Sequence, residues 1–230
     1  MKHFWLIMIF FAYFQTDTYK TERLNMVKSQ IENRGITNTL ILEAMRKVPR
    51  HLLVPENQKA NAYKDRPLSI GDGQTISQPY IVAHMTDLIQ PKKGMKVLEI
   101  GSGSGYQAAV LAEIVDQVFT IEIVENLGNR AKADLAKLGY KNVSVKIGDG
   151  YQGWPTEAPF DAILVTAAAE QIPQPLIDQL KEGGRMVIPV GKQGAVQELQ
   201  LVERIRGKVK ITSLGAVRFV PFTRDEKNKW

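Results

Sequence analysis

The stretch that decides the fold is Val97-Leu-Glu-Ile-Gly-Ser-Gly-Ser-Gly-Tyr106, in which an apolar strand passes through a glycine-rich turn into the start of a helix. Glycines allow the backbone to turn sharply and to approach a ligand closely, and the free N–H groups at a helix start favour anionic or polar groups. This order of elements is typical of the cofactor loop of a doubly wound α/β fold. The sequence therefore predicts a cofactor site at this turn.

The spacing of the glycines indicates which cofactor binds. A dinucleotide fingerprint requires Gly-x-Gly-x-x-Gly, and Tyr106 occupies the sixth position here, which disfavours a dehydrogenase. Glu99 lies two residues before the first glycine, where its carboxylate would repel a pyrophosphate but attract an ammonium group. S-adenosylmethionine carries an ammonium and a sulfonium, so we expect this cofactor.

Two further acids follow the next two predicted strands. Glu122 ends the strand 118–122, about 20 residues after the first glycine, where an acid can accept from both ribose hydroxyls. Asp149 follows the strand 143–147, where it can accept from an adenine amino group. Each acid alone is also compatible with a solvated strand end or an ordinary turn. Together with Glu99 they indicate the ligand crevice of a doubly wound sheet.

Composition narrows the class of protein. The 230 residues are 44% hydrophobic, enough for one sizeable core, and the net charge of +6 is spread along the chain and does not indicate a nucleic-acid partner. Cysteine is absent, which excludes a disulfide framework, a thiolate metal site and a cysteine nucleophile. The three histidines have no metal-ligand spacing, so we expect no metal, and we interpret His51 and His84 as packing or surface residues.

The N-terminus carries an apolar run over residues 4–14 that is too short to span a bilayer but has the length of a signal-peptide core. No small-x-small cleavage site follows it. The alternatives are a secretory leader, an interfacial anchor, or an extension upstream of a protein that begins at Met26. Because an enzyme that consumes S-adenosylmethionine needs a compartment that contains it, we expect a cytoplasmic protein, with export or membrane tethering through residues 4–14 as the alternative.

The chain divides into four predicted regions. They are a leader-like segment (1–20), an N-terminal helical and substrate region (21–92), a cofactor-binding core (93–195), and C-terminal strands with a tail (196–230). The first helical patterns place Leu24 and Leu40 on apolar faces, and residues 55–73 are expected to form a loop.

Strands and helices then alternate through the core, Gly183-Gly184 is expected to be a turn before a strand, and a hairpin is expected around Arg206-Gly207. The predicted fold is a doubly wound α/β fold with a mostly parallel sheet, an N-terminal helical cover and a C-terminal antiparallel hairpin.

Several segments together resemble one enzyme family, the protein-L-isoaspartate (D-aspartate) O-methyltransferases. The resemblance extends from about Met26 to the C-terminus and excludes the residues before Thr21. The segments Thr75-Ile-Ser-Gln-Pro79 and Pro159-Phe-Asp161 with Val165-Thr-Ala-Ala168 make it specific. The other resembling segments are 97–107, 148–150, 183–191 and 217–221.

The resemblance implies a class I methyltransferase that transfers a methyl group from S-adenosylmethionine to the free carboxylate of L-isoaspartyl, and also D-aspartyl, residues in damaged proteins. Repair then proceeds through the methyl ester and a succinimide. Its partners would then be isoaspartyl proteins and peptides, and we expect a monomer. The family's active-site serine maps to Ser77. The implied cofactor residues are Thr75, Ile76, Ser77, Glu99, Gly101, Gly103, Glu122, Asp149, Gly150, Thr223 and Asn228. The implied substrate residues are Thr166, Ala167, Ala168, Val220 and Pro221.

The same residues and motifs also fit other interpretations. Ser77 also fits a helix N-cap before Pro79, and the substrate residues also fit plain core packing. A cytosine-C5 methyltransferase needs a cysteine, and amino-directed enzymes use an Asn/Asp-Pro-Pro-aromatic segment, whereas residues 166–169 are Thr-Ala-Ala-Ala. A binding module without catalysis would not need Glu99, Glu122 and Asp149 together.

Overall fold

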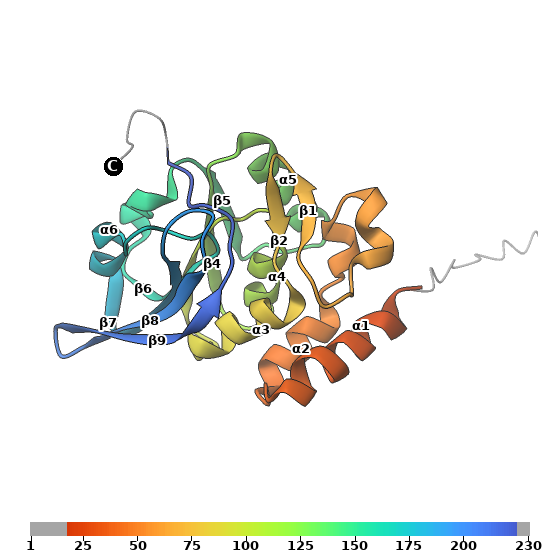
Figure 1. The fold of residues 1–230 in the computed structure, drawn as a ribbon, viewed down its shortest axis with the longest axis horizontal. Coiled ribbons are helices and arrows are strands. Elements are labelled where there is room, and N and C mark those ends of the chain that lie inside the picture. The colour runs from red at the N-terminus through yellow and green to blue at the C-terminus, as the bar shows by residue number, and fades with distance from the viewer. Residues whose placement is uncertain (1–17, 225–230) are drawn as a thin grey trace, which may run out of the picture.

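The computed structural model describes residues 18–224, so the apolar run 4–14 and Asn228 lie outside the described residues. A seven-stranded sheet forms the centre, in the order β5-β4-β3-β6-β7-β8-β9 (Figure 1). Strands β3 to β7 run parallel, and β7, β8 and β9 are joined antiparallel. The strands are β3 (Lys96–Ile100), β4 (Gln117–Glu122), β5 (Val143–Ile147), β6 (Phe160–Val165), β7 (Leu180–Val190), β8 (Gln197–Ile205) and β9 (Lys208–Val217). The predicted mostly parallel sheet with a C-terminal hairpin is confirmed.

The chain reverses its direction of travel across the sheet at β3. From β3 it proceeds outward through β4 to β5, and it then returns to place β6 on the other side of β3. In open α/β sheets, ligands bind at such a reversal, beyond the carboxyl ends of the strands. The topology therefore puts the glycine turn, which follows β3, at the expected crevice.

Helices and single turns surround the sheet. The α-helices are α1 (Lys20–Met26), α2 (Thr39–Lys47), α3 (Pro79–Leu88), α4 (Tyr106–Ala112), α5 (Glu125–Lys137) and α6 (Gln174–Asp178). The π- and 3₁₀-turns are η1 (Val27–Ile31), η2 (Glu32–Arg34), η3 (Arg50–Leu53), η4 (Glu56–Asn61), η5 (Gly150–Gln152) and η6 (Pro155–Glu157). Within the described part of the chain, none of these helices has the length and apolarity needed to cross a membrane.

Core residues alternate between the two faces of the sheet. Val97 packs into a large apolar cluster with the N-terminal helices, α4 and α5, whereas Leu98 packs into a second cluster with Phe160 and α6. Because adjacent residues of a strand point to opposite faces, a strand buried on both sides is apolar throughout. This burial explains the apolar residues Val97, Leu98 and Ile100 before the glycine turn, among which the buried Glu99 is the exception.

The N-terminal cover lies at one end of the sheet, with α1 and α2 beside α3 in Figure 1. The helices form close to where the apolar periodicity predicts them, but Leu24 is 40% exposed and Leu40 is 44% exposed, so both were wrongly placed on core faces. Leu42 is buried in α2. In a short helix the apolar residues can be grouped into more than one possible buried face. Which face is buried depends on the elements that pack against the helix.

Two local predictions were also wrong. Residues 55–73, expected to be a loop, contain η4 and the strand β1 (Leu68–Gly71), which pairs with β2 (Gln74–Ile76). The Gly183-Gly184 pair lies inside β7 and does not form a turn before it. In the first case the glycines at 71 and 73 flank the turn that joins β1 to β2. In the second, residues 181–184 form an irregularity in the pairing of β7 with β6, where Gly183 has a φ angle of 77°.

The hairpin between β8 and β9 turns at Arg206 and Gly207, as predicted, and both residues have positive φ angles of 53° and 71°. This is the backbone that a two-residue hairpin turn requires. After β9 the chain passes back over the carboxyl ends of the parallel strands, where Pro221 forms a parallel bridge with Ala168. The segment after β9 therefore closes one side of the crevice.

Candidate active site

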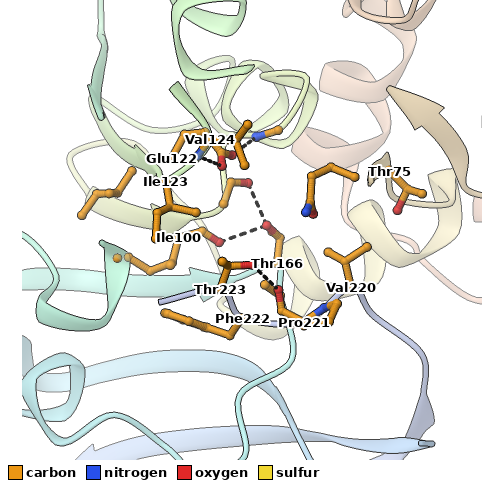
Figure 2. Close-up of a pocket in the computed structure, with 16 residues that line it drawn as sticks. Thr75, Ile100, Glu122, Ile123, Val124, Thr166, Val220, Pro221, Phe222 and Thr223 are labelled. Carbon is orange, nitrogen blue, oxygen red and sulfur yellow. Dashed lines mark hydrogen bonds between the residues drawn. The ribbon is translucent and has the colours of Figure 1, made fainter. Parts of the chain in front are cut away.

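Three neighbouring cavities lie beyond the carboxyl ends of β3, β4 and β6, and Thr75 and Thr166 line all three. The main cavity is lined by Ile100, Gly101, Glu122, Ile123, Val124, Gly150, Ala167 and the segment 220–223, among others (Figure 2). The inner cavity is lined by Ile76, Ser77, Glu99, Tyr106 and Gln107, among others. The outer groove is lined by Pro67, Ser77, Gln78, Ile81 and the segment 216–220, among others.

Gly101 allows the sheet end and Thr166 to approach each other. The Thr166 hydroxyl donates to the carbonyl oxygens of Ile100 (3.0 Å) and Gly101 (2.8 Å), as Figure 2 shows. A Cβ atom on Gly101 would lie 2.5 Å from the Thr166 hydroxyl oxygen, and the φ angle of Gly101 is +97°. Both the close approach and the backbone conformation therefore require glycine here.

The Glu122 side chain fixes the backbone of the glycine turn that follows β3. Its two carboxylate oxygens accept from the backbone N–H groups of Gly103 (2.7 Å) and Val124 (2.9 Å). The side chain lines the main cavity although it is 5% exposed. A carboxylate oxygen can accept a second hydrogen bond, so these contacts leave capacity for a ligand hydroxyl.

Glu99 is a fully buried acid that lines the inner cavity. Among the described residues, neither of its carboxylate oxygens has a hydrogen-bond partner. Burial raises the pKa of Glu99 to about 8; the nearby Thr120 hydroxyl lowers this pKa and Glu122 raises it. The Thr120 hydroxyl itself is 2.6 Å from Ser102 Oγ, which is its hydrogen-bond partner. An unpartnered buried carboxyl group is costly, and a ligand donor would satisfy it.

Asp149 has a partner that the sequence did not predict. Its Oδ1 accepts from the N–H of Tyr151 (2.9 Å), and its Oδ2 accepts from Arg224 Nε at 2.8 Å. The Arg224 guanidinium also lies 3.6 Å from the Tyr151 ring centre. Gly150, which follows Asp149, lines the main cavity, and a Cβ atom there would lie 2.4 Å from a methyl group of Ile100. The backbone at Gly150 therefore lies too close to Ile100 of β3 for any residue with a side chain.

Ser77 lies in the turn between β2 and α3 and lines both the inner cavity and the outer groove. The N-cap of α3 is Gln78, and this helix start has no side-chain cap hydrogen bond. The alternative in which Ser77 serves as the N-cap of α3 is therefore not what the structure shows. Its hydroxyl is not used to cap the helix, and the residue lies where two cavities meet.

The predicted substrate residues fall into two groups. Ala168 is buried, its N–H donates to the carbonyl of Val220 (2.8 Å), and its carbonyl accepts from the N–H of Phe222 (2.8 Å). Ala168 therefore holds the C-terminal segment in place. Thr166 and Val220 line the outer groove as well as the main cavity, while Ala167 and Pro221 line the main cavity.

The structure thus brings together, around these cavities, most of the residues that the sequence singled out. Sequence reasoning missed the apolar lining of the main cavity by Ile123, Val124 and Phe222 and the Asp149–Arg224 pair. The apolar residues directly after the strand-end acid Glu122 were an available signal. Nothing in the sequence indicated the ion pair. In the described part of the chain, no cluster of three or more acidic or histidine side chains is arranged to hold a metal ion.

Comparisons with known proteins show the family of this chain. The family model described as Protein-L-isoaspartate(D-aspartate) O-methyltransferase (PCMT) matches residues 21–227. A protein-L-isoaspartate O-methyltransferase of Opitutus terrae is 58% identical over 205 residues, which are 89% of this chain and 88% of that protein. Protein-L-isoaspartate O-methyltransferase 1 of Syntrophobacter fumaroxidans is 58% identical over 212 residues, which are 92% of this chain and 97% of that protein.

Solved structures give the same result. One protein-L-isoaspartate O-methyltransferase superposes with a TM-score of 0.79 at 30% identity over 88% of this chain and 65% of that one. A Plasmodium falciparum structure, provisionally assigned to the same activity and in complex with S-adenosyl-L-homocysteine, superposes with a TM-score of 0.76 at 26% identity over 88% and 99% of the two chains. From its matched length and its identity to these relatives, the chain belongs to the protein-L-isoaspartate (D-aspartate) O-methyltransferase family.

Proposed function

We propose that Ser77 aims the carboxylate that is methylated, at the point where the inner cavity meets the outer groove. The observation that carries this assignment is that Ser77 lines both spaces, whereas the hydroxyl is not used as a helix cap. A hydroxyl at such a junction can donate a hydrogen bond to a carboxylate that enters from the groove. The charge-assisted bond would fix the direction in which the carboxylate approaches.

The reaction itself follows from family membership. The enzyme transfers the methyl group of S-adenosylmethionine to the free carboxylate of L-isoaspartyl residues. The cofactor supplies an electrophilic methyl group on a sulfonium centre. The accepting carboxylate is ionised at neutral pH, so the protein needs no strong general base. The contribution of the chain is therefore to hold and orient, which is worth several kcal/mol in well-aligned reactions.

The donors and acceptors of the crevice fit this cofactor. The unpartnered carboxyl of Glu99 in the inner cavity suits the ammonium of the cofactor's amino-acid end. Glu122 in the main cavity suits the ribose hydroxyls, because each of its oxygens retains a free lone pair. The apolar wall formed by Ile123, Val124 and Phe222 suits a flat aromatic base.

Asp149 and Thr223 are assigned to the outer end of the same site. The Asp149 carboxylate already accepts from Arg224, so an adenine amino group would share this acceptor or replace that contact. Thr223 lines the main cavity, with its hydroxyl 3.5 Å from the Pro221 carbonyl oxygen. The assignment of Thr223 rests on its position in the main cavity and on the family resemblance. That of Asp149 rests on the family motif and on its neighbour Gly150, which lines that cavity.

The outer groove is assigned to the peptide. It is open beside Ser77 and is walled by the segment 216–220 and by Ile81. An isoaspartyl residue differs from an aspartyl residue by which carboxylate is in the backbone, so its free α-carboxylate projects from a shorter arm. A groove that fixes the backbone while Ser77 fixes the carboxylate would discriminate between the two.

The test compares Ser77→Ala with Ser69→Ala, a matched serine on the strand β1 that pairs with β2 and lines none of the three cavities. We expect Ser77→Ala to lower kcat on an isoaspartyl peptide by about 10- to 100-fold, as loss of a charge-assisted hydrogen bond does, with little change in cofactor affinity. Ser69→Ala should retain the wild-type kcat.

Two outcomes would contradict the assignment. A wild-type kcat in a folded Ser77→Ala variant would remove Ser77 from the reaction. Equal turnover of paired isoaspartyl and aspartyl peptides by the wild-type enzyme would show that the groove does not select the shorter arm. Thermal melting of each variant separates these results from a loss of folded protein.

We also propose that the enzyme works as a monomer in the cytoplasm. Support for the cytoplasm comes from the cofactor, because the enzyme must work in a compartment that contains S-adenosylmethionine. The monomer is the expectation stated above from the sequence. Light scattering of the purified protein and cell fractionation test these two points. Recovery of active enzyme in an exported or membrane fraction would instead favour a role for residues 4–14 in targeting.

A further inference from the structure

Arg50 is a fully buried arginine next to the site, although it lines none of the three cavities. Its Nε donates to the carbonyl of Ala62 (2.7 Å), and its Nη2 donates to the carbonyl of Ser77 (2.7 Å). Its guanidinium carbon lies 4.7 Å from the ring centre of Tyr106. One side chain thus contacts three segments that are distant in the sequence.

These segments are the parts of the fold that surround the reacting groups. Ala62 follows η4, Ser77 forms the turn between β2 and α3, and Tyr106 is the first residue of α4 after the glycine turn. Tyr106 is itself buried and lines the inner cavity together with Ser77. Arg50 therefore connects the main chain of Ser77 to the helix that carries the cofactor loop.

The chemistry of Arg50 is unusual for a side chain that only fills space. Burial lowers the pKa of Arg50 to about 10, so the side chain stays charged at neutral pH without solvent. Among the described residues it forms no ion pair, its Nη1 has no hydrogen-bond partner, and both of its bonds go to neutral carbonyl groups. Burying a cation in this way is costly, and an apolar residue of similar volume often stabilises such a position.

We propose that Arg50 is a positioning residue for methyl transfer, which holds the main chain of Ser77 in register with the cofactor loop. The proposal rests on the function assigned above to the Ser77 hydroxyl. Fixing the Ser77 carbonyl restricts the φ and ψ angles on either side of it, and so restricts the direction of the hydroxyl. Because Arg50 also contacts Tyr106, the first residue of α4, it holds the Ser77 hydroxyl in a fixed position relative to the start of that helix, where the cofactor would bind.

Arginine is the residue type that this task requires. Its planar guanidinium donates in two directions at fixed angles and stacks on an aromatic face at the same time. Lysine would keep the charge, but its donors all lie on one atom, so it lacks both the fixed spacing of the guanidinium donors and the flat face. Arg50→Lys therefore removes the link between the segments with the smallest change in volume and charge.

The experiment is a double-mutant cycle on the full-length enzyme with Arg50→Lys, Ser77→Ala and the combined variant. The matched control is Arg23→Lys, at another buried arginine of the N-terminal cover, whose Nε donates to the Arg46 carbonyl at 2.6 Å. Each variant is measured for kcat and KM on an isoaspartyl peptide, for S-adenosylhomocysteine affinity by calorimetry, and for Tm.

We expect Arg50→Lys to lower kcat by about 10-fold, because small misplacements of a reacting group cost this much or more. The Kd for S-adenosylhomocysteine should change by less than about 2-fold, since Glu122 and the glycine turn are untouched. In the combined variant, Arg50→Lys should lower kcat by less than about 2-fold beyond Ser77→Ala, because residues that act through one another are not additive. Arg23→Lys should keep the wild-type kcat.

The proposal is overturned if the two effects on kcat are additive, or if Arg23→Lys lowers kcat as much as Arg50→Lys at an equal loss of Tm. A wild-type kcat in Ser77→Ala alone would instead identify the proposed function as the failed step. If Arg50→Lys does not fold, Tyr106→Leu removes the ring beneath the guanidinium and leaves Arg50 in place. The same non-additivity with Ser77→Ala is then expected, and additivity would again refute the role of Arg50.

Discussion

Replacing Glu99 by glutamine should change how stability depends on pH in the cofactor-free enzyme. Burial raises the pKa of this carboxyl from its ordinary value of 4.5 to about 8 in the folded protein. At a pH between these two pKa values, Glu99 is protonated in the folded protein but ionised in the unfolded chain. The free energy of unfolding therefore falls as the pH rises through this window, and the loss is complete above the folded-state pKa.

The size of the effect follows from the width of the window. Each pH unit between the two pKa values corresponds to about 1.4 kcal/mol. From pH 5 to pH 7, wild-type enzyme should lose roughly 2–3 kcal/mol of unfolding free energy relative to Glu99→Gln, which has no proton to exchange at this position. The variant should thus be the more stable protein at pH 7 and should approach the wild type near pH 5.

Urea unfolding at several pH values between 5 and 8, without cofactor, measures this difference directly. Glu43→Gln is a suitable control, since it makes the same chemical change at an exposed acid of α2 that lines none of the three cavities. We expect the control to follow the wild-type pH dependence. Parallel curves for wild type and Glu99→Gln would refute the reasoning, because they would show that the buried carboxyl has the same proton affinity in both states.

Calorimetry tests whether cofactor binding releases the proton of Glu99. If Glu99 pairs with the ammonium of the cofactor, binding must release the proton that the buried carboxyl holds. Wild-type affinity for S-adenosylhomocysteine should then rise by up to about 10-fold per pH unit below pH 8, and Glu99→Gln should bind more weakly with no such rise. Observed enthalpies in buffers of different ionisation heat count the released proton. Absence of proton release from wild type would place the ammonium elsewhere.

The remaining predictions concern the ribose site and the N-terminus. Glu122→Ala should weaken binding of S-adenosylmethionine by about 1.5–3 kcal/mol, since it removes a ligand acceptor and the acceptor of two loop N–H groups; unchanged affinity in a folded variant would exclude Glu122 from the site. Removal of residues 1–17 should leave kcat and Tm unchanged. Removal of residues 1–25 should lower Tm, because Arg23 is 7% exposed and bonds to the carbonyl of Arg46; equal Tm values for the two truncations would show that α1 contributes nothing.

What the sequence determined by itself was the class of fold, and it predicted the edge of the sheet at which the cofactor binds. An apolar strand, a glycine turn and a helix are contiguous in the chain, and acids at the ends of successive parallel strands must meet at one edge of the sheet. These are consequences of local geometry and of strand direction, so Gly101, Glu99 and Glu122 could be placed at one edge of the sheet without coordinates. The Thr75–Pro79 and Thr166–Ala168 motifs made the family recognisable.

What only the tertiary structure decided depends on contacts between distant segments. The exposure of Leu24 and Leu40, the pairing of β1 with β2, and the ion pair of Asp149 with Arg224 all depend on which elements become neighbours. The same holds for Arg50, which no sequence motif singled out and which contacts the Ser77 carbonyl and the Tyr106 ring in the structure. Periodicity and spacing describe one element at a time, whereas burial, pKa and the partners of a buried charge are set by the packing of several elements together.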